Sequence, residues 1–225
     1  MGTDNLFHKR KAKAAEGLER RKAKRAPYNK ILIVCEGEKT EPNYFSELIN
    51  FYKLNTANVE IDGTCGSSPK SVFERAIELY RNEESKGDAF DFVYCVFDKD
   101  NHNTYDETLA KISGQIPKGV FNSATSVPCF EYWLLLHFQY TTKPYHAPGS
   151  SSIGNEVLKA LKAVFPEYTK GSENIFEILS GQLEFAKANA QRALAHAESN
   201  HTDNPTTYIH ELVDCLQNLK LTPDD

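Results

Sequence analysis

The chain has 225 residues, of which 40% are hydrophobic and 25% charged, and its formal net charge is −5. This length suits one main domain with an appendage, and the composition is that of a globular rather than a disordered protein. The longest strongly apolar run, residues 132–138, is far shorter than the roughly 20 residues that span a bilayer. The N-terminus is basic but lacks the apolar segment of a secretory signal. We therefore expect a soluble protein of the cytoplasm without a membrane span.

The charge is distributed unevenly along the chain. Residues 1–30 contain ten Lys or Arg and three Asp or Glu, a charge of +7, and the remaining 16 basic and 28 acidic residues give −12. A basic segment of this kind commonly contacts nucleic-acid phosphates. A helix that packs on the acidic body explains it equally well, and both interpretations stay open.

The five cysteines, an odd number, include no C-x-x-C pair. This pattern favours reduced, buried thiols over disulfides or a zinc site. The cysteines concerned are Cys35, Cys65, Cys95, Cys129 and Cys215.

Strand-like and helix-like patterns alternate in the first two thirds of the chain. In chain order, we expect a strand at 31–35, a helix capped by Thr40, a strand at 58–62, a helix at 71–82, a strand at 90–97, a helix at 104–116, a strand at 124–127 and a helix at 128–138. This alternation predicts an α/β fold with a parallel sheet covered on both faces.

A segment rich in Thr, Pro, Gly and Ser, residues 141–152, separates this part from a helical one. Beyond it we expect only helices, at 153–164, 174–197 and 205–219, the last capped by Asn204. The predicted organisation is a basic arm (1–28), an α/β core (29–140) and a helical C-terminal part packed on the core (141–225).

Acidic residues stand at the ends of two predicted strands. Glu36 and Gly37 follow the first strand, and Asp98 and Asp100 follow the strand at 90–97. Ligands bind outside the carboxyl ends of parallel strands, and in an extended segment Asp98 and Asp100 point to the same side. Crowded carboxylates favour a hard cation such as Mg²⁺ or Mn²⁺, and the glycine allows a tight turn. A D-x-D alone is also common in solvated turns, so the interpretation depends on the Glu-Gly that follows the strand at 31–35.

Three segments resemble the signature blocks of the RloB-like family, small members of the Toprim superfamily found in prokaryotic anti-phage and restriction loci. They are ILIVCEGEKTEPNYF at 31–45, VYCVFDKDNH at 93–102 and SVPCFEYWLLLHF at 126–138, and PEYTKG at 166–171 and NPTTYIHELV at 204–213 resemble the family's tail. The resemblance covers most of residues 20–220. It implies a Toprim-like parallel sheet flanked by helices, and a role in abortive infection.

The resemblance also implies roles for site residues. Glu36 with Gly37 matches the Toprim Glu-Gly, and Asp98 with Asp100 matches its D-x-D; Glu41 makes the first block similar to that of OLD-type nucleases. Asn101 and His102 replace the usual glycine after the D-x-D, a departure that fits the RloB-like subgroup but weakens any transfer of topoisomerase or primase chemistry.

Two further residues in these blocks have open roles. Glu131 either complements a helix dipole or is a further metal ligand. Lys170 either stabilises charge on a transferring phosphoryl group, as lysines of OLD-type enzymes do, or is a solvated turn residue. His137 is expected to be a packed core histidine.

These features predict a metal-dependent nuclease of an anti-phage defence system that hydrolyses phosphodiester bonds in DNA or RNA, tRNA included. The expected catalytic residues are Glu36, Glu41, Asp98, Asp100 and Lys170, and the expected metal ligands are Glu36, Asp98, Asp100 and Glu131. The chain lacks a Walker A motif, so an ATPase encoded nearby is the expected partner. The alternative is a non-catalytic, Toprim-like adaptor of such an ATPase. Both functions keep the carboxylates, so only a measurement of catalytic turnover distinguishes the nuclease from the adaptor.

Overall fold

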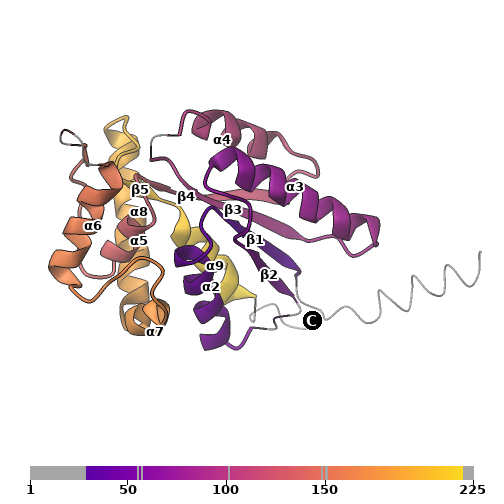
Figure 1. Cartoon of the computed structure of the whole chain (residues 1–225), viewed down its shortest axis with the longest axis horizontal. Coiled ribbons are helices and arrows are strands. Elements are labelled where there is room, and N and C mark those ends of the chain that lie inside the picture. The colour runs from indigo at the N-terminus through magenta and orange to yellow at the C-terminus, as the bar shows by residue number, and fades with distance from the viewer. Residues whose placement is uncertain are drawn as a thin grey trace, which may run out of the picture.

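The computed structural model describes residues 29–54, 56, 58–100, 102–147, 149 and 152–219. The predicted basic arm at 1–28 therefore lies outside the described residues. A five-stranded sheet has the order β2-β1-β3-β4-β5 (Figure 1). Its strands are β1 (Ile31–Cys35), β2 (Val59–Asp62), β3 (Phe92–Asp98), β4 (Phe121–Val127) and β5 (Thr206–Thr207). β1 to β4 are parallel and β5 is antiparallel to β4.

Helices cover both faces of this sheet, which confirms the predicted α/β class. They are α2 (Thr40–Phe51), α3 (Pro69–Ser85), α4 (Tyr105–Gly114), α5 (Glu131–Leu135), α6 (Ile153–Val164), α7 (Ile175–Leu179), α8 (Leu183–Ser199) and α9 (Ile209–Asn218), with the 3-10 turn η1 (Ser180–Gln182) between α7 and α8. In Figure 1, α3 and α4 lie above the sheet, and α2 and α9 lie below it. Within the described residues no helix is long and apolar enough to cross a membrane.

The apolar run of β1 is explained by burial on both faces. Ile31, Ile33 and Cys35 belong to the cluster that includes residues of α2 and α9, whereas Leu32 and Val34 pack with α3 and β3. All five side chains are fully buried, and each large aliphatic one contributes roughly 1.5–3 kcal/mol by leaving water. This buried strand therefore holds the residue that follows it, Glu36, at a fixed place.

Several predicted elements differ from the structure. The helix expected at 174–197 is interrupted by η1, where Ser180 and Gly181 are weak helix formers. The helix expected at 128–138 is only the short α5. The segment expected as a helix at 205–219 begins with β5, because β-branched Thr206 and Thr207 extend the sheet through backbone pairing with β4. Its helix, α9, starts only at Ile209, and its cap is Tyr208 rather than Asn204. The cap of α2 is Lys39 rather than Thr40.

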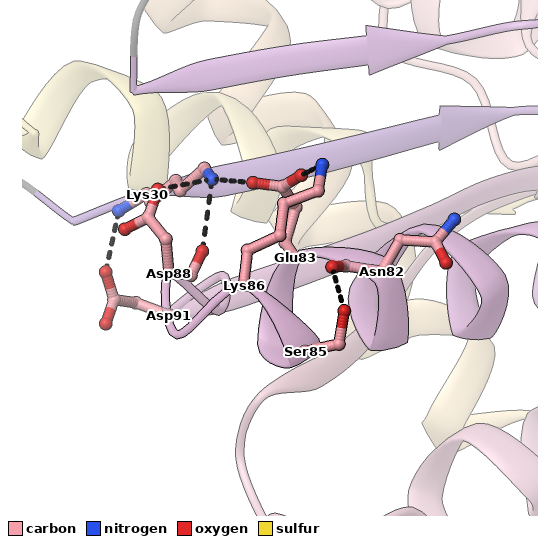
Figure 2. Close-up of polar contacts among 7 residues, drawn as sticks. All are labelled: Lys30, Asn82, Glu83, Ser85, Lys86, Asp88 and Asp91. Carbon is pink, nitrogen blue, oxygen red and sulfur yellow. Dashed lines mark hydrogen bonds and ion pairs between the residues drawn. The ribbon is translucent and has the colours of Figure 1, made fainter. Parts of the chain in front are cut away.

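An ion-pair cluster fastens the amino end of β1, opposite the end at which Glu36 lies (Figure 2). The Lys30 ammonium contacts Glu83 Oε2 at 2.6 Å and Asp88 Oδ2 at 2.8 Å, and the Lys30 backbone N–H donates to Asp91 Oδ2 at 2.7 Å. Burial alone would lower the pKa of Lys30, but hydrogen bonds to Asp88 and Glu83 outweigh it and raise the pKa. The cluster ties the start of β1 to the α3–β3 connection.

The cysteines are all free thiols. Cys35, Cys95 and Cys129 are buried, while Cys65 and Cys215 are half-buried. The predicted burial thus holds for three of the five.

Candidate functional site

The pairing of β1 with β3 brings Glu36 and Asp98 together. Cys35 is in register with Val96, and the Glu36 N–H continues the ladder by donating to the Val96 carbonyl at 3.0 Å. Glu36 Oε2 then accepts a hydrogen bond from the Asp98 backbone N–H at 2.9 Å. The two acidic residues therefore meet at the carboxyl edge of the sheet.

Glu41, in the first turn of α2, adds a third carboxyl group. Its side chain is buried, and burial, followed by the charges of Glu131 and Glu36, raises its pKa to about 7. A Cβ at Gly37 would stand 2.8 Å from Glu41 Oε2, and the φ of Gly37 is not in the left-handed region. The glycine of the Glu-Gly pair therefore makes room for the Glu41 carboxylate rather than supplying an unusual backbone conformation.

A second glycine, Gly63, supports the same turn. A Cβ there would lie 2.6 Å from the Gly37 carbonyl oxygen and 2.8 Å from Pro42 Cγ. The Gly37 oxygen belongs to the backbone, so it cannot move aside as the end of a flexible side chain could. A larger residue at position 63 would therefore force the backbone to shift. Sequence reasoning missed Gly63, which lies one residue after β2 and outside the recognised blocks.

Asp98 lies among the other carboxyl groups. Burial raises its pKa well above the ordinary range, and the charges of Glu41, Glu131 and Glu36 add to the increase, while a backbone hydrogen bond from Phe130 opposes it. Four carboxyl groups thus share one poorly solvated region at the sheet edge.

Asp100 is placed differently from the prediction. The expectation of a shared direction with Asp98 required an extended segment, but β3 ends at Asp98 and Asp100 has a φ of +30°. Its N–H donates to the Pro128 carbonyl at 3.1 Å, and its side chain is exposed. The alternation rule is therefore wrong for this pair, because the chain turns toward the β4–α5 connection.

Glu131 and Lys170 form an ion pair beside these groups. The Lys170 ammonium lies 3.0 Å from Glu131 Oε1, and the Tyr168 hydroxyl donates to the same oxygen at 3.3 Å. Glu131 is 2% exposed, whereas the Lys170 side chain is 58% exposed. Burial alone would lower the pKa of Lys170, but the charge and hydrogen bond of Glu131, together with Cys129 and Asp98, outweigh it and raise the pKa. Lys170 is therefore not simply a solvated turn residue.

One face of α2 holds the segment that carries Lys170. The Gly171 N–H donates to Thr40 Oγ1 at 3.1 Å, and Asn43 Nδ2 donates to the Gly171 carbonyl at 3.2 Å. Glu47 accepts from the backbone N–H groups of Asn174 and Phe176 at 2.5 and 2.8 Å. These supporting roles were missed, although the positions i, i+3 and i+7 form a polar stripe that marks a helix face.

Two histidines near the recognised blocks differ in role. His102 Nε2 lies 3.0 Å from Glu36 Oε1, a contact that the sequence analysis did not foresee. His137 is 1% exposed, its Nδ1 lies 3.1 Å from the Trp133 carbonyl oxygen, and burial lowers its pKa to about 4. This confirms the prediction of a packed core histidine.

The four crowded carboxyl groups suit a hard divalent ion in their chemistry, because buried like charges are stabilised by a cation. However, among the side chains the structure describes, no three His, Cys, Asp or Glu residues stand in the arrangement of a metal site. Glu36 and Glu131 contact His102 and Lys170 instead. The carboxyl groups thus have the chemistry that such an ion prefers, but they do not have its arrangement, since Glu36 and Glu131 are turned toward protein partners.

Fold and site together define an α/β protein that gathers acidic side chains at the carboxyl edge of a mainly parallel sheet. A family model described as RloB-like protein matches residues 31–216, and the chain belongs to this family. This confirms the resemblance seen in the sequence blocks. No curated protein and no solved structure matches the chain.

Proposed function

We propose that this chain is a metal-dependent nuclease that uses Mg²⁺ or Mn²⁺ to hydrolyse phosphodiester bonds in DNA or RNA. The observation that carries the proposal is the convergence of Glu36, Glu41, Asp98 and Glu131 at one sheet edge, with the Lys170 ammonium beside them. Carboxylates of this kind bind hard cations, and a lysine is a suitable point charge for phosphate oxygens. The likeness of these motifs to Toprim nucleases, and the anti-phage setting of RloB-like proteins, support the same role.

Each residue has a distinct part in this proposal. Glu36, Glu41 and Asp98 would hold the ion, which when bound supplies Lewis-acid stabilisation and a more acidic water. Lys170 offers its remaining ammonium donors to a phosphate oxygen. Exposed Asp100 stands at the rim, where it is available to a ligand that enters from solvent.

A cleavage assay tests the proposal. Purified full-length protein is incubated with Mg²⁺ or Mn²⁺ and labelled single-stranded DNA, duplex DNA, tRNA or unstructured RNA, alone and with the proposed ATPase partner. We expect cleavage of at least one substrate, and a loss of about 100-fold or more in Glu36→Gln, which removes charge at nearly constant volume. The control is Glu60→Gln on β2, whose side chain is exposed and which should cleave normally.

A second function is favoured by one specific observation. Glu36 and Glu131 already have protein partners, the His102 ring nitrogen and the Lys170 ammonium, as expected of acidic residues that serve structure. In that case the chain is a non-catalytic partner of an ATPase. Wild-type protein that binds the ATPase but cleaves none of the substrates would favour this function over the nuclease.

A further inference from the structure

The starting observation concerns the positively charged side chains near the carboxyl edge of the sheet. Several of them form ion pairs: Arg75 with Asp62, Lys99 with Asp203, and Lys170 with Glu131. Lys39, which follows β1 and caps α2, is exposed and forms no ion pair with any residue that the structure describes. Its charge is therefore available to an anion from solution.

The aliphatic stem of Lys39 packs against Gly171. Gly171 has a φ of +76°, and a Cβ there would lie 3.1 Å from Lys39 Cβ and 3.2 Å from Lys39 Cδ, so glycine leaves the room in which the stem lies. The Gly171 backbone is held in turn by hydrogen bonds to Thr40 and Asn43 of α2, at 3.1 and 3.2 Å. Because both sides of this contact are fixed, Lys39 loses less side-chain entropy when it binds a ligand than a free surface lysine does.

The same contact brings the backbone positions of two lysines together. Lys170 immediately precedes Gly171, so Lys39 and Lys170 come from distant segments to neighbouring places at this edge. Neighbouring positive charges repel each other and do not stabilise the fold. Glu131 offsets the charge of Lys170, whereas no described acidic residue pairs with Lys39. An uncompensated lysine at this place suits a ligand with regularly spaced negative charges, and a nucleic-acid backbone is such a ligand.

We propose that Lys39 is a nucleic-acid-binding residue, whose ammonium contacts a backbone phosphate at the carboxyl edge of the sheet. The inference rests on the proposed nuclease function for its choice of ligand, but it requires no divalent ion. Phosphate contacts fix the place of a nucleic acid on a protein and carry no base information. Lys39 therefore contributes affinity for nucleic acid of any sequence rather than sequence specificity.

The test measures the binding of full-length protein to fluorescein-labelled duplex DNA and single-stranded RNA by fluorescence anisotropy, in EDTA and at about 50 to 200 mM NaCl. Lys39→Gln removes the charge but keeps the Cβ, Cγ and Cδ atoms that pack on Gly171. We expect this variant to bind about threefold or more weakly at the lowest salt. Its plot of log affinity against log salt should be less steep by about 0.9 for the duplex and about 0.7 for the single strand. Lys39→Arg keeps the charge and should bind as wild type does.

Lys53→Gln is the matched control. Lys53 is an exposed lysine just beyond the other end of α2, about 20 Å away along the helix, and it forms no ion pair with a described residue. The two variants have the same net charge and the same basic segment at 1–28, so neither feature can produce a difference between them. We expect Lys53→Gln to keep the affinity and the salt dependence of the wild type.

Equal losses of affinity in Lys39→Gln and Lys53→Gln would overturn the inference, since net charge would then explain both. Unchanged binding by Lys39→Gln, or no binding by the wild type in EDTA, would overturn it as well. These results leave the nuclease proposal intact if the wild type cleaves nucleic acid with Mg²⁺ or Mn²⁺. Binding that depends on Lys39, without cleavage of any nucleic acid, would support the inference and contradict the nuclease.

Discussion

Gly37 shows how closely single residues in this site depend on one another. Its missing side chain leaves the space that Glu41 Oε2 occupies, and Gly63 in turn leaves space for the Gly37 carbonyl. A motif glycine is usually attributed to backbone freedom. Here its role is to accommodate a carboxylate, and the two glycines link β2, the turn after β1 and α2.

At this scale we predict that Gly37→Ala lowers Mn²⁺ affinity by about tenfold or more, because the new methyl group displaces the Glu41 carboxylate. The crowding should also cost about 1–3 kcal/mol of unfolding free energy. Calorimetry and thermal denaturation measure the two effects. Gly114→Ala at the end of α4 is the control, since a Cβ there meets nothing within 4 Å. Wild-type affinity in Gly37→Ala would show that Glu41 does not bind the ion.

The sequence was sufficient to place Glu36 and Asp98, because residues that follow neighbouring parallel strands share one edge of the sheet. It could not set the direction of Asp100, which depends on a positive φ after β3. Nor could it show that Lys170 reaches Glu131, 39 positions earlier, because that contact depends on how the C-terminal part packs. Local patterns determine strand ends, whereas contacts between distant segments depend on tertiary structure.

Among the elements, α2 joins the two halves of the site. Its first turn carries Glu41, and the same helix holds the Lys170 segment through Thr40, Asn43 and Glu47. Movement of α2 would therefore change the positions of a carboxylate and of the ammonium together.

We predict that Thr40→Val loosens the Lys170 segment, because it removes the acceptor of the Gly171 N–H at nearly constant volume. The expected cost is about 1 kcal/mol in unfolding free energy, and cleavage should slow about tenfold through misplacement of the ammonium. Thr40→Ser keeps the hydroxyl and should retain both properties. Damage in Thr40→Ser but not in Thr40→Val would instead identify the Thr40 methyl group, and core packing, as the important feature.

The accuracy of the element predictions follows the strength of local signals. α6 has the predicted bounds, since its apolar spacing and its Ser152 cap agree. β5 was missed because two threonines carry no strand pattern of their own, and they form a strand only by pairing with β4. The interruption at η1 was missed because Leu179, Leu183 and Ala186 keep a helical spacing across it.

At the scale of the whole molecule, the two ends of the sheet differ in how their acidic residues are compensated. Glu83 and Asp88 at the amino end form ion pairs with Lys30, whereas carboxyl groups crowd together at the other end. A cation that binds beside buried like charges lowers their repulsion and so stabilises the folded state. The stability of the fold should therefore depend on that cation. For the basic segment at 1–28, outside the described residues, nucleic-acid contact and a helix packed on the acidic body both stay open predictions.

Thermal denaturation of the full chain with and without Mn²⁺ tests most directly whether this cluster holds a divalent ion. At 100 times the dissociation constant, binding stabilises the fold by about 2.7 kcal/mol, which for a protein of this size raises Tm by about 5 to 11 °C. We expect this rise in wild type and in Asp106→Asn, an exposed aspartate of α4, and its loss in Asp98→Asn. An unchanged Tm in wild type, or an equal rise in Asp98→Asn, would contradict a metal site at these carboxylates.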